Sequence, residues 1–208
     1  MENMPGEHDD RRTQDAIGKS ELRLMNSRGR ELLLKYWDFP LFASSLGRHG
    51  ISLDNRRILD AGCGSGYTLE LITQRFHPGQ LTAFDLVPSQ VELARARGTE
   101  AAVFVADITS LELPAQSFDA VFVCGVLHHC REWRSGLASV ARVLTHGGVL
   151  LLEEILAAAE SRLGHPVSVA RLPLVKFLTP LQPGQEARRT RSRPSTLGSI
   201  RFLPLIKS

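Results

Sequence analysis

Short apolar runs recur through the middle of the chain, and polar or glycine-containing segments separate them. The runs predict five buried β-strands, at residues 57–61, 81–84, 102–106, 118–124 and 149–152. Apolar residues at helical spacing follow Pro88 as far as Gly98, and a second such pattern extends from Trp133 to Leu144. Short strands that alternate with helices predict an α/β fold, a Rossmann-like, doubly wound and mostly parallel sheet with flanking helices.

The pattern changes before the first of these strands. Residues 1–18 are polar and lack periodicity, so we expect a flexible leader there. Residues 21–36 carry apolar positions at helical spacing and predict one or two helices. We therefore expect one folded domain at 19–181, with its ligand-binding core at 57–154.

The carboxyl end does not continue the alternation of strands and helices. After Glu154 the sequence predicts a helix as far as Ala159, and prolines then recur between positions 166 and 183. Residues 199–206 are the only strand candidate there, and Pro204 restricts them to a sheet edge. The last strands of the sheet are therefore not placed, and this end of the domain is expected to be missing or divergent.

Composition is ordinary, but charge is unevenly distributed. Of the 208 residues, 43% are hydrophobic and 23% are charged, which excludes wholesale disorder. The net charge is +3, yet residues 182–208 hold six Lys or Arg against one acid, so the remaining chain is close to neutral. This distribution argues against a basic nucleic-acid-binding fold. The arginine-rich run at 188–193 leaves an RNA contact open, but a solvated, flexible tail at 182–208 is favoured because Phe202 is its only aromatic residue.

Cysteine usage and hydropathy bear on the compartment. The three cysteines, Cys63, Cys124 and Cys130, have no zinc-type spacing, so we expect reduced thiols and no metal site. No apolar run approaches the roughly 20 residues of a membrane-spanning helix. The sequence thus predicts a cytoplasmic protein without a membrane partner.

A glycine-rich turn, Gly62-Cys63-Gly64-Ser65-Gly66, follows the first strand and its Asp60. Dinucleotide-binding folds use G-x-G-x-x-G, whereas here the third glycine comes one residue early. The carboxylate of Asp60 would repel a pyrophosphate but attract a cationic amine. Asp85 ends the second strand, 19 residues after Gly66, which is the usual distance for a carboxylate that binds a ribose. The pattern favours a ligand with a ribose and a zwitterionic end, and S-adenosyl-L-methionine has both.

Several segments together carry a family resemblance. They are 58–66, Asp85, 106–108, 118–124, the Leu-His-His at 127–129, and 142–151. This set resembles the class I S-adenosylmethionine-dependent methyltransferases, in particular the type 11 branch that acts on small molecules. The resemblance covers about residues 57–154.

The resemblance implies contacts with the methionine and ribose parts of the cofactor. Asp60 and the backbone of 62–66 would hold the methionine end. Asp85 would bind the ribose hydroxyls, and Leu86 would pack on the adenine. A glycine-rich turn after a strand can also be purely structural, and Cys63 fits a small filler of the turn.

The resemblance also implies contacts with the adenine and the methyl group. Asp107 would accept a hydrogen bond from the adenine amine, and Ile108 would line the other face of the ring. Cys124 and Gly125 would lie beside the transferred methyl. Two alternatives stay open, because Asp107 could merely cap the following turn and Cys124 could be a packing residue.

The two histidines after the fourth strand are the candidate catalytic residues. A methyl transfer needs a base only when the acceptor is a hydroxyl or a carbon acid, and the ordinary pKa of histidine suits that role. His129 is preferred to His128, although either could simply bond the backbone or pack beneath the loop. The segment after the fourth strand begins Cys124-Gly125 and lacks the Asn- or Asp-Pro-Pro-aromatic motif. That absence argues against DNA adenine or protein glutamine as acceptor.

The expected function is therefore S-adenosyl-L-methionine-dependent methyl transfer to an unidentified small-molecule acceptor. One alternative is a non-catalytic relative that binds the cofactor or a partner subunit, which the unplaced strands would favour. A nucleotide-linked oxidoreductase is disfavoured by the glycine spacing and by Asp60. Neither the acceptor nor the oligomeric state is encoded in a readable pattern.

Overall fold

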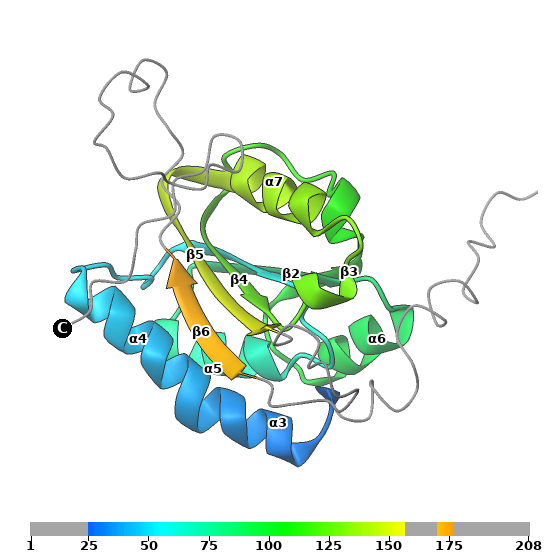
Figure 1. Cartoon of the computed structure of the whole chain (residues 1–208), viewed down its shortest axis with the longest axis horizontal. Helices are drawn as coiled ribbons and strands as arrows, with labels where there is room; N and C mark the ends of the chain where they lie inside the picture. The colour runs from blue at the N-terminus through cyan, green and yellow to red at the C-terminus, as the bar shows by residue number, and fades with distance from the viewer. Residues whose placement is uncertain (1–24, 157–169, 177–208) are drawn as a thin grey trace, which may run out of the picture.

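The computed structural model describes residues 25–156, with side chains as far as Glu154, and the backbone of residues 170–176. The described strands form one sheet in the order β3-β2-β1-β4-β5-β6 (Figure 1). The strands are β1 (Arg57–Ala61), β2 (Gln80–Asp85), β3 (Ala102–Val105), β4 (Phe118–Cys124), β5 (Leu144–Leu156) and β6 (Ala170–Lys176). Neighbouring strands from β3 to β5 are parallel, and β6 is antiparallel to β5. The predicted doubly wound, mostly parallel sheet is confirmed.

Helices cover both faces of the sheet. They are α3 (Arg28–Leu33), the π-helix η1 (Leu34–Asp38), α4 (Phe39–Arg48), α5 (Tyr67–Phe76), α6 (Pro88–Ala96) and α7 (Trp133–Val143). Two 3-10 turns follow β3 and β4, namely η2 (Ile108–Ser110) and η3 (Leu127–His129). In Figure 1, α7 lies on one face and the other α-helices lie on the opposite face.

Alternation along the strands assigns each side chain to one of two cores. On β1, Ile58 packs in the core beneath α4 and α5, whereas Leu59 packs in the core beneath α7. On β4, Phe122 belongs to the first core, where its ring stacks on that of Phe39 at a centroid distance of 5.7 Å. The same alternation continues to the carboxyl ends of the strands and decides which way their polar residues face.

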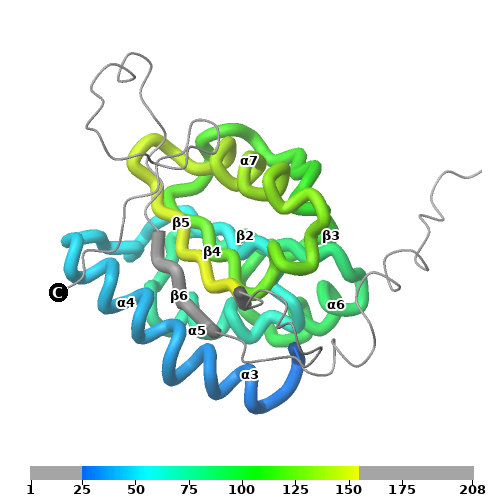
Figure 2. Tube along the Cα trace, in the orientation of Figure 1, coloured from blue at the N-terminus to red at the C-terminus, as the bar shows by residue number. Residues whose placement is uncertain are grey.

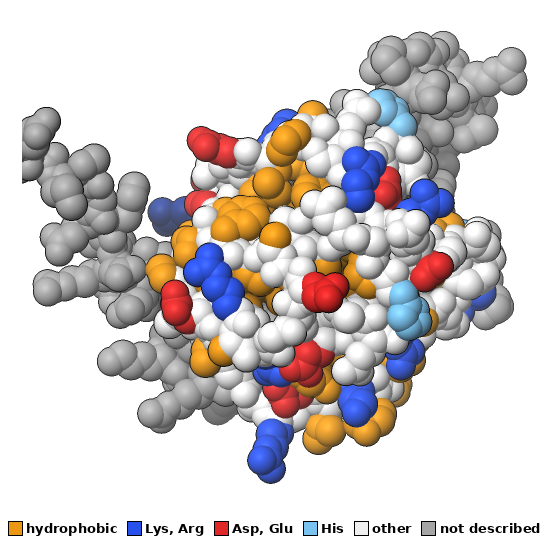
Figure 3. Space-filling view, turned by 180° about the vertical axis from the view of Figure 1, so that it is seen from behind, with side chains coloured by type: hydrophobic (Ala, Val, Ile, Leu, Met, Phe, Trp, Pro, Cys, Tyr) orange, Lys and Arg blue, Asp and Glu red, His pale blue; other side chains and the backbone are white. Residues whose placement is uncertain are grey.

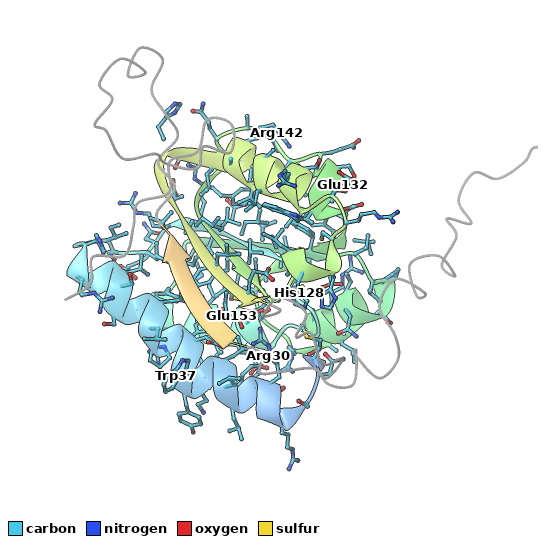
Figure 4. All side chains as sticks on the ribbon, in the orientation of Figure 1. Arg30, Trp37, His128, Glu132, Arg142 and Glu153 are labelled. Carbon is cyan, nitrogen blue, oxygen red and sulfur yellow. The ribbon has the colours of Figure 1, made fainter. Side chains whose placement is uncertain are left out.

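The segments α3, η1 and α4 form an almost continuous rod along that first face (Figure 2). The π-helical turn ends two residues before Pro40, which has no backbone N–H for the carbonyl four residues earlier. The wider turn buries Asp38 and leaves Trp37 exposed. In Figure 4, Trp37 points away from the sheet, so this turn sets which residues the rod presents inward.

Two expectations for the carboxyl end are wrong. The helix expected after Glu154 does not begin there, because β5 continues to Leu156. The segment 199–206 was expected to be the only strand candidate, but β6 pairs with β5 and places Pro173 opposite Glu153. Proline interrupts most strands, but it is tolerated on an edge strand when its nitrogen faces away from the neighbouring strand, and β6 is the outermost of the described strands. The expected leader and tail, like 199–206 itself, lie outside the described residues.

Charged side chains of both signs are interspersed on the face shown in Figure 3, and hydrophobic side chains gather between them. Among the described residues, no helix is long and apolar enough to cross a membrane. All three cysteines are free.

Candidate functional site

A cavity lies at the carboxyl ends of β1 to β4, where ligands bind in open parallel sheets. Its described lining is Met25, Gly62, Gly64, Phe84, Asp85, Leu86, Val87, Gln90, Ala106, Asp107, Ile108, Gly125, Val126, His129 and Cys130. Eight sequence-predicted site residues are in this set, namely Gly62, Gly64, Asp85, Leu86, Asp107, Ile108, Gly125 and His129. Five others do not line the cavity: Asp60, Cys63, Gly66, Cys124 and His128.

The glycine-rich turn shapes one wall of the cavity by close packing. Gly62 and Gly66 have φ values of +83° and +85°, which side chains rarely adopt. A Cβ on Gly62 would lie 2.4 Å from Cγ2 of Val126, and a Cβ on Gly66 would lie 2.7 Å from Cα of Ala94. Glycine is therefore required for the turn to fit between the β4–η3 segment and α6.

Four of the five backbone N–H groups of this turn are already bonded within the protein. Those of Gly62 and Cys63 donate to the carbonyl oxygen of Phe84, at 2.8 and 2.9 Å. The N–H of Gly64 donates to Oδ2 of Asp85 at 2.8 Å, and that of Gly66 to the carbonyl of Cys63. In this structure these four residues supply the shape of the wall rather than open donors.

Asp85 is held rigidly at the end of β2. Its Oδ2 accepts from Gly64, and its Oδ1 accepts from the backbone N–H of Val87 at 2.9 Å. Burial raises the pKa of Asp85, while these backbone hydrogen bonds and nearby His129 act in the opposite direction. A carboxylate has about four lone-pair sites, so each oxygen retains capacity for a further donor in the cavity.

Asp107 does cap the turn that follows it. Its Oδ1 accepts from both the backbone N–H and the hydroxyl of Thr109, each at 2.8 Å. Its Oδ2 has no hydrogen-bond partner among the described residues. Asp107 therefore caps the turn through one oxygen, and as a cavity-lining residue it keeps its second oxygen for a further donor, so its contact with a ligand stays a prediction.

Asp60 lies behind the cavity and is fully buried. Its side chain points to the α5 face, where Oδ2 accepts a short hydrogen bond from the hydroxyl of Thr68, and Oδ1 has no partner among the described residues. Burial raises the pKa of Asp60 from 3.8 to about 7, the Thr68 bond opposes this, and the charge of Asp85 adds to it. The side chain of Asp60 therefore lies in the core next to the glycine turn and does not line the cavity.

The cysteines differ in their access to the cavity. Cys63 and Cys124 are buried in the core beneath α4 and α5, and burial raises the pKa of both thiols. The side chain of Cys124 packs in this core and does not line the cavity. Cys130 is half-buried and lines the cavity; burial and then the carboxylates of Asp107 and Glu154 raise the pKa of its thiol.

The two histidines have different surroundings. His129 lines the cavity, and its ring lies 3.9 Å from that of His128 between centroids. His128 turns away, and its Nδ1 lies 2.8 Å from Oε2 of Glu154. Geometry therefore favours His129 over His128 as the group that faces a ligand.

A buried ion pair supports the cavity from beneath Gly125. The guanidinium of Arg30 donates to both carboxylate oxygens of Glu153, at 2.7 and 3.3 Å, and lies 3.7 Å from Asp38 (Figure 4). Glu153 in turn accepts the N–H of Gly125 through its backbone carbonyl, at 2.8 Å. The pair joins α3 to the ends of β4 and β5.

Sequence reasoning missed Arg30, Glu153 and Glu154. The adjacent acids after the fifth strand were a visible signal, since charged residues are unusual at the end of a buried strand. Arg30 gave no signal, because its partner lies 123 residues further along the chain.

The matches to known proteins cover the part of the chain that forms strands β1 to β5. The family described as "Methyltransferase domain" (type 11) matches residues 59–152. The malonyl-[acyl-carrier protein] O-methyltransferase of Serratia marcescens is 33% identical over 115 residues, 55% of this chain and 44% of that protein. The ubiquinone biosynthesis O-methyltransferase of Xanthomonas oryzae is 36% identical over 110 residues, 50% of this chain and 45% of that protein. The crystal structure of YcgJ from Bacillus subtilis gives a TM-score of 0.52 at 25% identity, covering 59% of this chain and 52% of that one.

Residues 59–152 belong to the class I S-adenosylmethionine-dependent methyltransferases. The resemblance drawn from the sequence is confirmed, and the cofactor of this family is S-adenosyl-L-methionine. This chain spans less than half the length of the two O-methyltransferases.

Proposed function

We propose that the methyltransferase domain binds S-adenosyl-L-methionine in the cavity and transfers its methyl group to a small-molecule acceptor. The observation that carries the proposal is the convergence of Asp85 and Asp107 on one cavity with Gly62, Gly64 and His129. These residues come from the ends of β1 to β4. The arrangement offers acceptors for hydroxyl and amine donors along a glycine wall that admits a ligand close to the backbone.

The described residues fit the nucleoside part of this cofactor. Two internal hydrogen bonds fix the carboxylate of Asp85, so its remaining lone pairs can accept both ribose hydroxyls without reorganisation. Asp107 retains Oδ2 for the adenine amine. Exposed Leu86 and buried Ile108 line the same cavity and supply apolar surface for the ring.

The described residues also suit a cationic ligand. Fully buried Asp60 lies two residues before the glycine turn, and Asp85 lines the cavity. An ionised carboxylate in a partly desolvated site stabilises a nearby positive charge, and a bound cation in turn favours the ionised form of the carboxyl group. In this proposal Asp60 acts through its field on the methionine end, since its side chain does not line the cavity.

S-adenosyl-L-methionine, when bound, supplies a methyl group on a positively charged sulfur. The chain aligns the acceptor and excludes water, an effect that can account for several kcal/mol of the barrier. Gly125, Val126, Cys130 and Met25 provide the apolar lining for this task. His129 is the proposed base, whose imidazole accepts the proton of an acceptor hydroxyl.

The finer proposal is an oxygen acceptor. It is supported by the names of the two relatives, which are both O-methyltransferases, and by an imidazole in the cavity that an oxygen acid can use. The experiment is a methyl-transfer assay on a panel of hydroxyl, carboxylate, amine and carbon acceptors. Transfer to amines alone would contradict the oxygen proposal.

Cofactor binding is tested directly by calorimetry with S-adenosyl-L-methionine and, separately, with NAD. We expect Asp85→Ala to weaken S-adenosyl-L-methionine binding at least tenfold, because each lost charge-assisted hydrogen bond contributes about 1.5–3 kcal/mol. Asp54→Ala, at an exposed site, is the matched control. An unchanged dissociation constant in folded Asp85→Ala would remove Asp85 from the site, and preferential NAD binding would overturn the proposal.

The role of His129 is tested once an acceptor is known. His129→Ala should lower turnover about 100-fold or more and leave cofactor affinity near that of the parent protein. His146→Ala, at an exposed site that does not line the cavity, is the control and should leave turnover unchanged. Equal turnover in parent and His129→Ala would assign His129 a structural role.

A further inference from the structure

Glu154 is the one acid at the end of β5 that faces the η3 side of the sheet. Strand alternation directs Glu153 towards α3, where it meets Arg30, and directs Glu154 to the opposite face. Only 12% of the Glu154 side chain is exposed. A carboxylate this buried needs several donors to compensate for its lost hydration.

The donors all come from three consecutive residues. Oε1 of Glu154 accepts the backbone N–H groups of Val126 and Leu127, at 3.0 and 2.6 Å. Oε2 accepts the N–H of His128 at 3.3 Å and lies 2.8 Å from its Nδ1. One side chain, 26 to 28 residues away in sequence, therefore holds the whole start of η3.

This segment is part of the cavity wall. Val126 and His129 line the cavity, and the first N–H groups of η3 have no partner within the turn itself. The N-cap residue of η3 is Val126, whose side chain cannot cap. The ring of His128, held by Glu154, lies against the ring of His129. A continuous set of contacts thus leads from Glu154 to the imidazole in the cavity.

We propose that Glu154 is a positioning residue of the candidate site, which fixes residues 126–128, selects the tautomer of His128 with its proton on Nδ1, and thereby holds His129 in the cavity. The importance of His129 for chemistry rests on the proposed function; the positioning by Glu154 does not. Nδ1 must carry the proton because its partner is a carboxylate oxygen, which only accepts.

Glu154→Gln is a sharp probe because it keeps the size of the side chain. Two backbone N–H groups point at the Oε1 position, so the amide oxygen of glutamine is required there. The amide NH₂ then faces Nδ1 of His128, which must become the acceptor. The substitution is therefore expected to move the proton of neutral His128 to Nε2.

The tautomer is read by two-bond ¹H–¹⁵N correlation spectra of histidine-labelled full chain, recorded at an alkaline pH at which the spectra themselves show a neutral imidazole. His128→Asn identifies the signals of His128. We expect the Nδ1–H form in the parent protein and the Nε2–H form in Glu154→Gln. Glu132→Gln, at an exposed site on the N-terminal side of α7, is the matched control and should leave the parent form unchanged (Figure 4).

Two further readouts separate positioning from general stability. Amide hydrogen exchange at 126–128 should accelerate about tenfold or more in Glu154→Gln, without a matching change in β1. Binding of S-adenosylhomocysteine, used as the probe, should weaken about threefold to tenfold, and Glu132→Gln should change neither quantity.

The possible outcomes test the proposed role of Glu154 independently of the proposed methyl-transfer function. An Nε2–H tautomer of His128 in the parent protein overturns the proposal, and this needs no folded variant. Parent-like exchange at 126–128 in Glu154→Gln also overturns it, as does unchanged S-adenosylhomocysteine affinity in a parent protein that binds the probe. If the parent protein does not bind S-adenosylhomocysteine, the proposed function fails, while the tautomer and exchange results still test Glu154.

Discussion

One wall of the cavity is a run of consecutive residues, the glycine turn at 62–66, whereas the wall at 125–129 is held by side chains from distant parts of the chain. The glycine turn keeps its shape through positive φ angles and bonds to the neighbouring strand. The second wall depends on Glu154 and on the pair between Arg30 and Glu153. The first is encoded by local backbone chemistry and the second by tertiary contacts.

This difference explains why a short sequence motif identifies the wall at 62–66 but not the wall at 125–129. Glycine is needed at 62 and 66 because any Cβ would meet Val126 or Ala94, so residue type and position are both constrained. An acid at 153 or 154 is constrained by what it reaches, and those partners do not lie within any short pattern.

The largest expected effect is on the tertiary wall. Arg30→Met should lower the free energy of unfolding by about 3–5 kcal/mol, because it removes the guanidinium from two buried carboxylates, Glu153 and Asp38. Chemical denaturation measures this change. Arg28→Met, at an exposed position on the same helix, is the control and should shift stability by less than about 0.5 kcal/mol. Equal effects of the two substitutions would show that the buried pair does not support this wall.

The glycine wall is tested by substitutions at matched φ angles. Gly66→Ala should destabilise by about 2–5 kcal/mol, since alanine is strained at φ +85° and its Cβ would meet the backbone of Ala94. Gly98→Ala has a φ of +68° but open space around it, so only the conformational cost of about 1–2 kcal/mol is expected. Thermal or chemical denaturation compares them. Equal losses would mean that close packing against α6 is not what requires glycine at 66.

A smaller effect concerns Asp60, behind the glycine wall. Its pKa is about 7 in the folded protein and near 3.8 when exposed, so the folded state keeps a proton that the unfolded state has released. This contribution makes stability fall as pH rises between about 4 and 7, by roughly 1 kcal/mol per pH unit. Asp60→Asn should flatten that slope, measured as the free energy of unfolding at several pH values. The raised pKa of Asp85 acts in the same direction and remains in the variant.

Asp54→Asn, an exposed substitution on the loop before β1, is the control for this series. It should leave the pH slope unchanged. A slope in Asp60→Asn as steep as in the parent protein would place the responsible proton on another group.

The sequence predicted the sheet well where signals are local. Strands β1 and β4 have the predicted bounds, and Gly98 follows α6 at a positive φ as the helix-ending pattern requires. Sequence reasoning failed at β6, because proline is tolerated on an edge strand and β6 is the outermost of the described strands. An edge position is a property of the assembled sheet and is not visible in a short segment.

The site residues likewise fall into those that local sequence signals identify and those that depend on tertiary contacts. The sequence by itself determined the glycine turn, Asp85 and Asp107, because backbone geometry at strand ends limits which residues can stand there. Only the tertiary structure decided that Asp60 and Cys124 lie behind the cavity, that His129 rather than His128 lines it, and that Arg30 and Glu154 support it. The physical reason is distance along the chain: strand alternation fixes which face a side chain takes, but the partner it meets there comes from packing of segments up to 123 residues apart.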